Sequence, residues 1–485
     1  MQKWNTGFWG ITIIVLTFLF VLTKNDPFFG DSISTISRAA NHIYESDFTE
    51  ISYPQNLDPG HPLSFSVIHA FGWKLLGKKL WVSHLINLIF GILTLGLFVK
   101  WGKQLGFGST VYVGAFFLLV TPLFVSQLAN PNLHLPLTFF TLGFAYSLRR
   151  GVVWQQIFFA SAMLLTHLQG LYYLTPIWLW WFFTNNEAPV FKRFVYSIKI
   201  FWIPALLFIG WLVYHHSITG WYLSSPDYSG HRGFPGIKRF VVNLIMADWR
   251  IVDYGQIALW MLPVWTLFRG KLKLKWDHPL SLFLVVFLFN SIAIGLTTKT
   301  GPMHRYLLPS LPFLVMANVH LLKDKSLRPV IPIFLILLSG HFWFYPGKIM
   351  GDATLSYRSV FPLLAEAKSD FNNVTFHTYA PLSNPGVDTY LNDNQDDYVA
   401  LYDVSMDTIP YVIYSNISGD FSVDEVETLK TKWPCKTYEK GYVYLEVYSN
   451  PQLIEQPIVN EKRKPSAFEV WFIKLKHTIK GTDGV

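Results

Sequence analysis

An isolated carboxylate follows the first apolar stretch of the chain. Asp31 lies in Phe28-Phe29-Gly30-Asp31-Ser32, a few residues beyond an apolar run that ends near residue 24. An ionised group this close to hydrocarbon is costly unless it has a partner or a function, which makes Asp31 a candidate functional residue. The same residue can also be the N-cap of a helix containing Ile33 to Ile43. The two roles are compatible, because a cap holds its carboxylate rigidly.

A second acid and a histidine share a short turn. In Asp58-Pro59-Gly60-His61-Pro62-Leu63, proline and glycine favour a turn and present His61 at the start of an apolar segment. His61 could hydrogen-bond a phosphate, or it could simply satisfy a backbone carbonyl. Asp58 is expected to line the cavity in which His61 would bind such a phosphate.

Three potential cations lie together late in the chain. The segment runs from Lys299 through His304, Arg305 and Tyr306. The topology argued below puts it on the non-cytoplasmic side, where the positive-inside tendency does not explain basic residues. A fixed anion is a reasonable partner, and the forked donors of Arg305 suit a phosphate. The alternative is that these side chains reach out to lipid headgroups.

Further polar residues stand at the same predicted depth. Asn132 and His134 belong to a Pro-bearing turn between two apolar segments, and such a turn is often only a turn. His167 lies near the end of another apolar segment, where it could line a cavity or bond between helices. The usual nucleotide-binding and hydrolase motifs (P-loop, GxGxxG, HExxH, GxSxG) are absent from the sequence.

The composition identifies the class of protein that must position these residues. The 485 residues are 51% hydrophobic and only 14% charged, about half the charge of a typical soluble chain. The charges cluster between apolar runs long enough to cross a bilayer, so the net charge of +8 indicates membrane topology and not nucleic-acid binding. With Cys435 as the single cysteine, an internal disulfide and a cysteine-based metal site are both excluded.

The apolar runs predict a polytopic transmembrane helical bundle of about eleven spans, mainly α. The predicted spans are 7–24, 81–99, 108–128, 134–148, 152–170, 171–184, 194–214, 252–268, 279–296, 305–322 and 329–345. With the N-terminus in the cytoplasm, the short basic loops all fall on one side, among them Arg149/Arg150 and Lys192/Arg193. The N-terminal segment is expected to be a retained helix, because no cleavage site follows it.

Three segments are then expected outside the cytoplasm. The first loop, 25–80, carries Asp31, Arg38, Asp58 and His61, and residues 63–80 predict an amphipathic helix in the plane of the membrane interface. A second long loop covers 215–251. Residues 346–450 read as a small α/β domain, and the tail 451–485 could form a helix at the membrane surface.

Taken in order, these features resemble the C-type (GT-C) membrane glycosyltransferases, which use sugars linked to lipid phosphate. The branch that looks most similar contains bacterial lipid A aminoarabinose transferases and protein O-mannosyltransferases. The resemblance covers about residues 1–345. It rests on Gly30-Asp31, on the turn Pro59–Leu63, on the turn Asn130–Leu137 and on the Arg-Tyr-Leu-Leu-Pro element Arg305–Pro309.

The resemblance implies an inverting transfer in which Asp31 is the catalytic base. His61, Arg305, Lys299 and Arg38 would then bind the donor phosphate, and Asp58, Asn132, His134, His167 and Tyr306 would line the cavity. Relatives often have two adjacent acids where this chain has Asp31-Ser32, and an acid where it has His134. A divalent cation, Mg²⁺ or Mn²⁺, is therefore only a possible cofactor, and its ligands are unknown.

The sequence thus predicts a glycosyltransferase of a bacterial inner membrane, with its C-terminal domain outside the cytoplasm. The donor would be a polyprenyl-phosphate sugar, hexosyl or pentosyl, and the acceptor a lipid, a glycan or a protein. The alternatives are a non-catalytic lipid or glycolipid transporter and a structural subunit of an envelope-glycan assembly. Partners are expected among membrane lipids, and nucleic acid is not expected.

Overall fold

The structure is a computed structural model. It describes residues 2–30, 32–53, 58–185, 188–223, 225, 232–270, 274–299, 301–323, 328–343, 353–371, 376–378, 398–400, 408–417 and 429–454. By contacts the chain divides into two units, one made of Met1–Asn25 and Ser34–His341, the other of Asp26–Ile33 and Phe342–Val485. The predicted domain boundary at residue 345 falls outside the described residues, as does the predicted surface helix of the tail.

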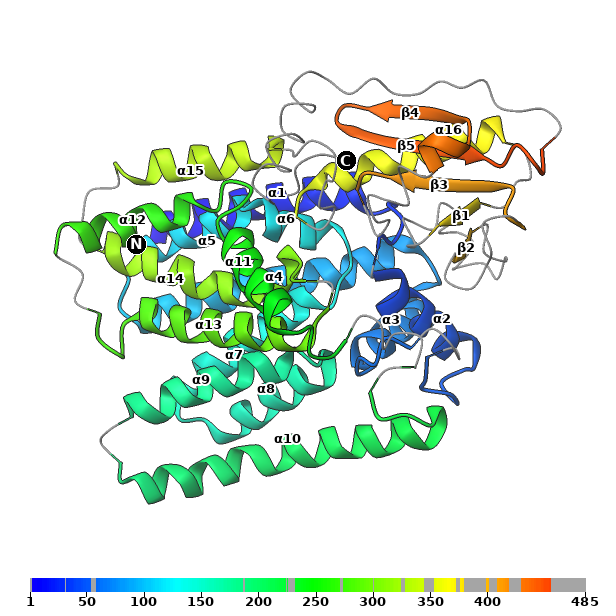
Figure 1. The fold of residues 1–485 in the computed structure, drawn as a ribbon. Helices are drawn as coiled ribbons and strands as arrows, with labels where there is room; N and C mark the ends of the chain where they lie inside the picture. The colour runs from blue at the N-terminus through cyan, green and yellow to red at the C-terminus, as the bar shows by residue number, and fades with distance from the viewer. Residues whose placement is uncertain are drawn as a thin grey trace. The chain divides into compact units, whose positions relative to one another are not determined.

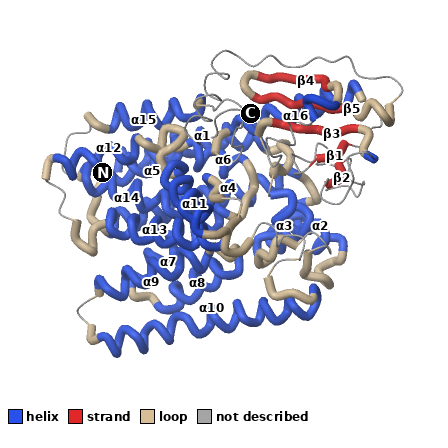
Figure 2. The backbone as a smooth tube through the Cα atoms, in the orientation of Figure 1, coloured by secondary structure: helices blue, strands red, loops and turns tan. Residues whose placement is uncertain are grey.

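The first unit is helical (Figures 1 and 2). Its α-helices are α1 (Gln2–Thr23), α2 (Arg38–Glu45), α3 (Ser64–Leu76), α4 (Leu80–Gln104), α5 (Thr110–Val120), α6 (Pro122–Ala129), α7 (His134–Arg150), α8 (Val153–Thr166), α9 (Gly170–Thr184), α10 (Val190–Thr219), α11 (Ile237–Arg250), α12 (Ala258–Phe268), α13 (Pro279–Thr297), α14 (Leu311–Leu322) and α15 (Val330–Ser339). Shorter turns are the π-helix Ile33–Ser37 and the 3₁₀ helices η3 (His304–Ser310) and η4 (Gly340–Phe342).

Four of these helices are long and apolar enough to cross a membrane: α1, α4, α10 and α13. The bent pair α5 and α6 makes a possible fifth, and several shorter apolar helices accompany them. The polytopic, mainly α bundle is therefore confirmed, whereas the count of eleven spans stays a prediction.

The predicted span 108–128 is broken in the middle. Its two halves, α5 and α6, meet at an angle of 63°. Thr121 lies at the break with an extended backbone, because the ring of Pro122 disfavours the helical conformation of the residue before it.

Helix α10 lies at the edge of this unit and packs against α8 (Figure 1). It has 30 residues, about 45 Å, more than a hydrocarbon core requires. Only 17% of its most apolar 18-residue stretch is buried, and large apolar side chains such as Phe191 and Trp202 are exposed. Exposed apolar surface of this extent suits contact with lipid.

The predicted interfacial segment 63–80 is shorter than expected. Helix α3 ends at Leu76, because Gly77 adopts a left-handed φ of +90° that stops the helix. One face of α3 is buried through Phe65 and Trp73, while Phe71 and Leu75 are exposed. An exposed apolar face next to a buried one is what a helix at the membrane interface requires.

The second unit contains the five-stranded sheet (Figure 2). Its strands are β1 (Phe376–Thr378), β2 (Tyr398–Ala400), β3 (Tyr411–Ser415), β4 (Cys435–Lys440) and β5 (Val443–Ser449), in the order β2-β1-β3-β5-β4. The β1 pairings are parallel, and β3-β5 and β5-β4 are antiparallel. Helix α16 (Val360–Asp370), preceded by the 3₁₀ turn Leu355–Ser359, packs on β4 and β5. A small α/β unit near the C-terminus is thus present, as predicted.

Candidate active site

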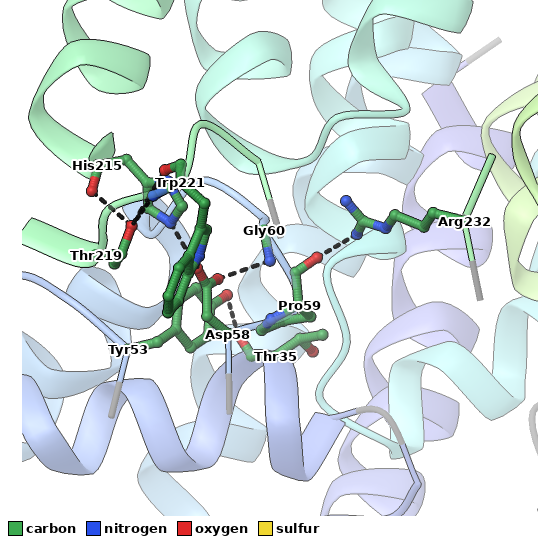
Figure 3. Close-up of polar contacts among 9 residues, drawn as sticks. All are labelled: Thr35, Tyr53, Asp58, Pro59, Gly60, His215, Thr219, Trp221 and Arg232. Atoms are coloured by element: carbon green, nitrogen blue, oxygen red, sulfur yellow. Dashed lines mark hydrogen bonds and ion pairs between the residues drawn. The ribbon is translucent and has the colours of Figure 1, made fainter. Parts of the chain in front are cut away.

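Asp58 is the centre of a buried hydrogen-bond network in the helical unit (Figure 3). One carboxylate oxygen accepts the amide of Gly60 at 2.7 Å, which closes the predicted turn. The other faces His215 Nε2 at 2.7 Å and accepts the indole N–H of Trp221 at 2.6 Å. Asp58 and His215 are both almost fully buried. A buried carboxylate with three donors holds its neighbours firmly, since losing any one of them leaves charge unsatisfied.

This network joins the first loop to the second. Trp221 and Ser225 follow α10, and the Ser225 amide donates to the Asp58 carbonyl at 3.2 Å. Further along the same loop, the guanidinium of Arg232 donates to the carbonyl of Pro59 (Figure 3). Arg232 also pairs by backbone with Thr298, at the end of α13. The loop after α10 is therefore tied at both ends, and Arg232 is positioned beside the turn that carries His61.

Three histidine rings, two of them stacked and the third tilted, lie together next to that turn, and we call them the histidine stack. His61 stacks on His167 with ring centroids 4.0 Å apart, and His134 lies 4.8 Å from His167. Asn132 orients His134, because its side-chain oxygen lies 2.7 Å from Nδ1 of that ring. The ring of His167 accepts the Gln169 amide at Nδ1, so its proton is assigned to the other nitrogen.

Arg305 lies near this stack, linked to it through the ring of Tyr306. It is 7% exposed, its guanidinium lies 5.1 Å from the ring centroid of Tyr306, and the Tyr306 ring is 5.3 Å from His134. Arg305 interacts electrostatically with all three histidines, and Arg232 does so with His61 and His167. Two guanidinium groups from distant segments thus converge on one group of imidazoles.

The backbone of η3 is held by polar side chains of the surrounding helices. The Tyr306 carbonyl accepts from Gln169 at 2.8 Å, from Asn290 at 3.3 Å and from the hydroxyl of Tyr173. Three donors on one carbonyl fix the direction of the segment, so Arg305 is presented by a braced turn and not by a mobile loop.

Burial and charge act on His61 in the same direction. Burial, followed by the electrostatic effect of His167, Arg232, His134 and Arg305, holds the pKa of His61 well below its usual value of 6.5. A neutral imidazole offers one N–H donor without adding charge to a site that already has two guanidinium groups. The arrangement is suited to bind an oxyanion, with cations supplying charge and His61 supplying a directed hydrogen bond.

His304 belongs to a separate pair. Its Nε2 lies 2.9 Å from a carboxylate oxygen of Asp253, the other oxygen of which accepts the amide of Tyr254 at 2.7 Å. Arg250 approaches the same carboxylate at 3.8 Å. Consecutive residues His304 and Arg305 therefore have different surroundings, an acid for the first and imidazoles for the second.

The structure brings together most of the residues singled out in the sequence. His61, Asn132, His134, His167, Arg305 and Tyr306 form one cluster, and Asp58 braces its edge. Lys299 is exposed, with its side chain near Gly233, and Arg38 is half-buried at the start of α2. Asp31 lies outside the described residues, so its role stays a prediction.

Sequence reasoning missed His215, Trp221, Arg232 and Asp253. Two of them carried a usable signal: His215 ends a long apolar helix and Asp253 begins a predicted span, and ionisable groups at such depths are functional or paired. Arg232 gave no such signal, because nothing in its local pattern distinguishes it from an ordinary loop arginine.

The predicted divalent cation finds no donor set among the described residues. No group of three or more His, Cys, Asp or Glu within them is arranged to hold a metal ion. Asp58 directs both oxygens at N–H groups, and the histidine stack faces guanidinium cations, which disfavour a metal. The divalent cation stays only a possible cofactor, with unknown ligands.

Comparisons with known proteins show which known fold this chain resembles. No family model matches the chain, and no curated protein matches it by sequence. Among solved structures, ArnT from Cupriavidus metallidurans bound to undecaprenyl phosphate has a TM-score of 0.58 at 12% identity, covering 94% of this chain and 100% of that one. Apo ArnT from the same organism gives 0.54 at 11% identity, covering 94% and 99%.

At such identity the likeness is one of fold. The predicted resemblance to aminoarabinose transferases is confirmed at that level, over both units of the chain. Together with the apolar helices, it identifies the chain as a multi-pass membrane protein with the fold of ArnT.

Proposed function

We propose that this protein is an inverting glycosyltransferase that takes a sugar from a polyprenyl-phosphate donor at the extracytoplasmic face of a bacterial inner membrane. The observation that carries the proposal is the convergence of Arg305, Arg232 and His61 at one end of the helical unit. The fold supports it, since ArnT has been crystallised with undecaprenyl phosphate.

The role of each residue follows from the charge that develops during such a transfer. The acceptor oxygen bonds to the anomeric carbon while the bond from that carbon to the donor phosphate oxygen breaks. The acceptor proton passes to the carboxylate of Asp31, and polyprenyl phosphate leaves with the bonding electrons. Charge therefore grows on the phosphate, where guanidinium groups held in advance by η3 and by the loop after α10 stabilise it.

The base is tested by Asp31→Asn. We expect turnover to fall by about 10²- to 10⁴-fold, the usual contribution of a positioned general base, while donor affinity changes by less than about threefold. Asp47→Asn is the matched control, because Asp47 is an exposed first-loop acid that pairs with Lys74 at 2.6 Å. Wild-type turnover by Asp31→Asn would remove Asp31 from the mechanism.

The alternative function is a lipid or glycolipid transporter, which needs the cationic cluster but no base. A transporter predicts that Asp31→Asn moves lipid-linked sugar normally and that no glycosylated product forms. The substrates are identified most directly by mass spectrometry of lipids that co-purify with the protein. A structural subunit would neither retain such a donor nor convert it.

A further inference from the structure

A second basic site lies at the opposite end of the helical unit. Helix α7 carries His134 at its start and Arg149 and Arg150 in its last turn, 17 residues in all, or about 25 Å. Helix α9 (Gly170–Thr184) likewise follows its N-cap Gln169, beside the histidine stack, and carries Trp180 and Trp181 near its other end. The candidate active site and this second region are thus separated by roughly the thickness of a hydrocarbon core.

The region contains a cavity of about 640 Å³ that opens to the surface. The described side chains that line it include four cations and one acid, namely Arg149, Arg150, Lys192, Arg193 and Asp277. A volume of this size is within the range of pockets that bind organic ligands, and it far exceeds what an inorganic ion requires. The excess of positive charge favours an anion.

Aromatic side chains hold the arginines in place around the cavity. The guanidinium of Arg149 lies 5.4 Å from the Trp180 ring, and that of Arg193 lies 4.9 Å from the Phe182 ring. Trp181 stacks on Tyr196 with centroids 5.3 Å apart. Cations preordered on ring faces lose less freedom when they bind a ligand than freely moving surface side chains do.

Two of the cations occupy a position that helix electrostatics disfavours. Lys192 and Arg193 lie in the first turn of α10, which begins at Val190. The N-terminal end of a helix carries partial positive charge, so it repels these side chains and attracts anions. A basic loop can satisfy the positive-inside tendency without placing its cations there. An anion in the cavity would offset the repulsion.

The surface next to the cavity shows what kind of anion fits. Phe191, Phe194 and Ile198 of α10 are all exposed, and Phe191 is 76% exposed. They continue the lipid-facing surface of that helix directly from the first-turn cations. A soluble phosphate makes no contact with such an apolar surface, whereas the acyl chains of a phospholipid would pack along it.

We propose that this cavity binds the phosphate headgroup of an anionic membrane lipid, between Arg150 and the first-turn cations of α10, with the acyl chains along α10. The site is independent of the proposed catalytic activity. The ligand group is a phosphate diester bound by two to four basic side chains. The acyl chains distinguish a lipid from free phosphate.

The test is native mass spectrometry of the full-length protein in detergent, titrated with phosphatidylglycerol or with phosphatidylcholine. The test variant is Arg150→Gln/Lys192→Gln, because both side chains are exposed and Arg150 contacts Tyr146 of its own helix, donating to the hydroxyl at 3.3 Å with the ring centroid 5.7 Å away. The matched control is Lys103→Gln/Arg269→Gln, which removes the same charge from side chains on the rings of Tyr112 and Trp265, outside the cavity.

We expect wild type and control to bind phosphatidylglycerol in preference to phosphatidylcholine. The cavity variant should bind phosphatidylglycerol about twenty-five-fold more weakly, fivefold for each of the two charges removed. Equal losses in both variants would mean that net charge alone attracts the lipid, and would overturn the site. Equal displacement of phosphatidylglycerol by soluble glycerol phosphate would overturn the assignment of a lipid.

Discussion

Asp58 and His215 are 157 positions apart in the chain, yet their side chains meet at 2.7 Å inside the helical unit. One belongs to the loop after the first helix and the other to the last turns of α10. Their contact, extended by Trp221, fixes the start of the loop that delivers Arg232 to the turn of His61. The cationic cluster is therefore a product of tertiary pairing between two long loops.

Replacing Asp58 by Asn should weaken this junction. An amide nitrogen in place of the oxygen that faces His215 and Trp221 would set donor against donor, so we expect a loss of about 2 kcal/mol in the free energy of unfolding. Donor affinity should fall as well, because the loop that carries Arg232 is then held less firmly at the end next to α10. Asp248→Asn, at an exposed acid of α11, is the control. The junction would be unimportant if both variants melted and bound alike.

Arg305 should be the most sensitive of the predicted phosphate ligands. We expect Arg305→Gln to lower kcat by about 10²- to 10³-fold, as loss of a preorganised donor to a developing oxyanion does. Arg305→Lys should not restore it, because an ammonium lacks the forked donors and the stacking on Tyr306. The steady-state rate on a lipid-linked donor measures this.

Lys299→Gln provides the comparison, since that side chain is exposed and Arg305 is not. We expect it to change kcat by less than about threefold. A larger loss at Lys299 than at Arg305 would reverse the assignment of the leaving-group ligand.

The segment on either side of Asp31 belongs to the second unit and is anchored within it. Arg358 forms a salt bridge with Asp26, and Phe29 lies 5.0 Å from the Tyr357 ring. We expect Arg358→Met and Asp26→Asn each to lower kcat about tenfold while KM for the donor stays near wild type. The double variant should be no worse than either single one, because both remove the same contact.

Lys436→Gln tests whether any salt bridge of this unit has that effect. Lys436 pairs with Asp370 at 2.7 Å at the surface, and its loss should leave kcat unchanged. Additive losses at Asp26 and Arg358 would show that the two side chains act separately, and the anchoring role would then be wrong.

The sequence predicted the membrane class and most members of the cluster, because apolar length, basic loops and polar residues at unusual depth are local signals. The span predicted from the apolar run missed the break at Thr121, although Pro122, which divides the run into two helices, is a local signal for it. The sequence could not pair Asp58 with His215 or bring Arg232 to Pro59, since such contacts depend on how long loops return to the bundle. Nor could it show that Arg305 and its neighbour His304 have different surroundings, because the two residues differ in the side chains around them and not in their local sequence pattern.

The pH dependence of stability should report the state of His61. The pKa of His61 in the folded protein is well below 6.5, the ordinary value in an unfolded chain. Below about pH 6.5, His61 therefore binds a proton in the unfolded state but not in the folded state. Stability is therefore complete above that pH and decreases as the pH falls through 6 and 5. We expect His61→Asn to flatten this decrease, and His216→Asn, at a histidine stacked on Tyr222 near the end of α10, is the matched control. Melting temperatures between pH 8 and pH 5 measure both slopes, and a His61→Asn slope identical to wild type would mean that His61 takes up its proton in the folded protein.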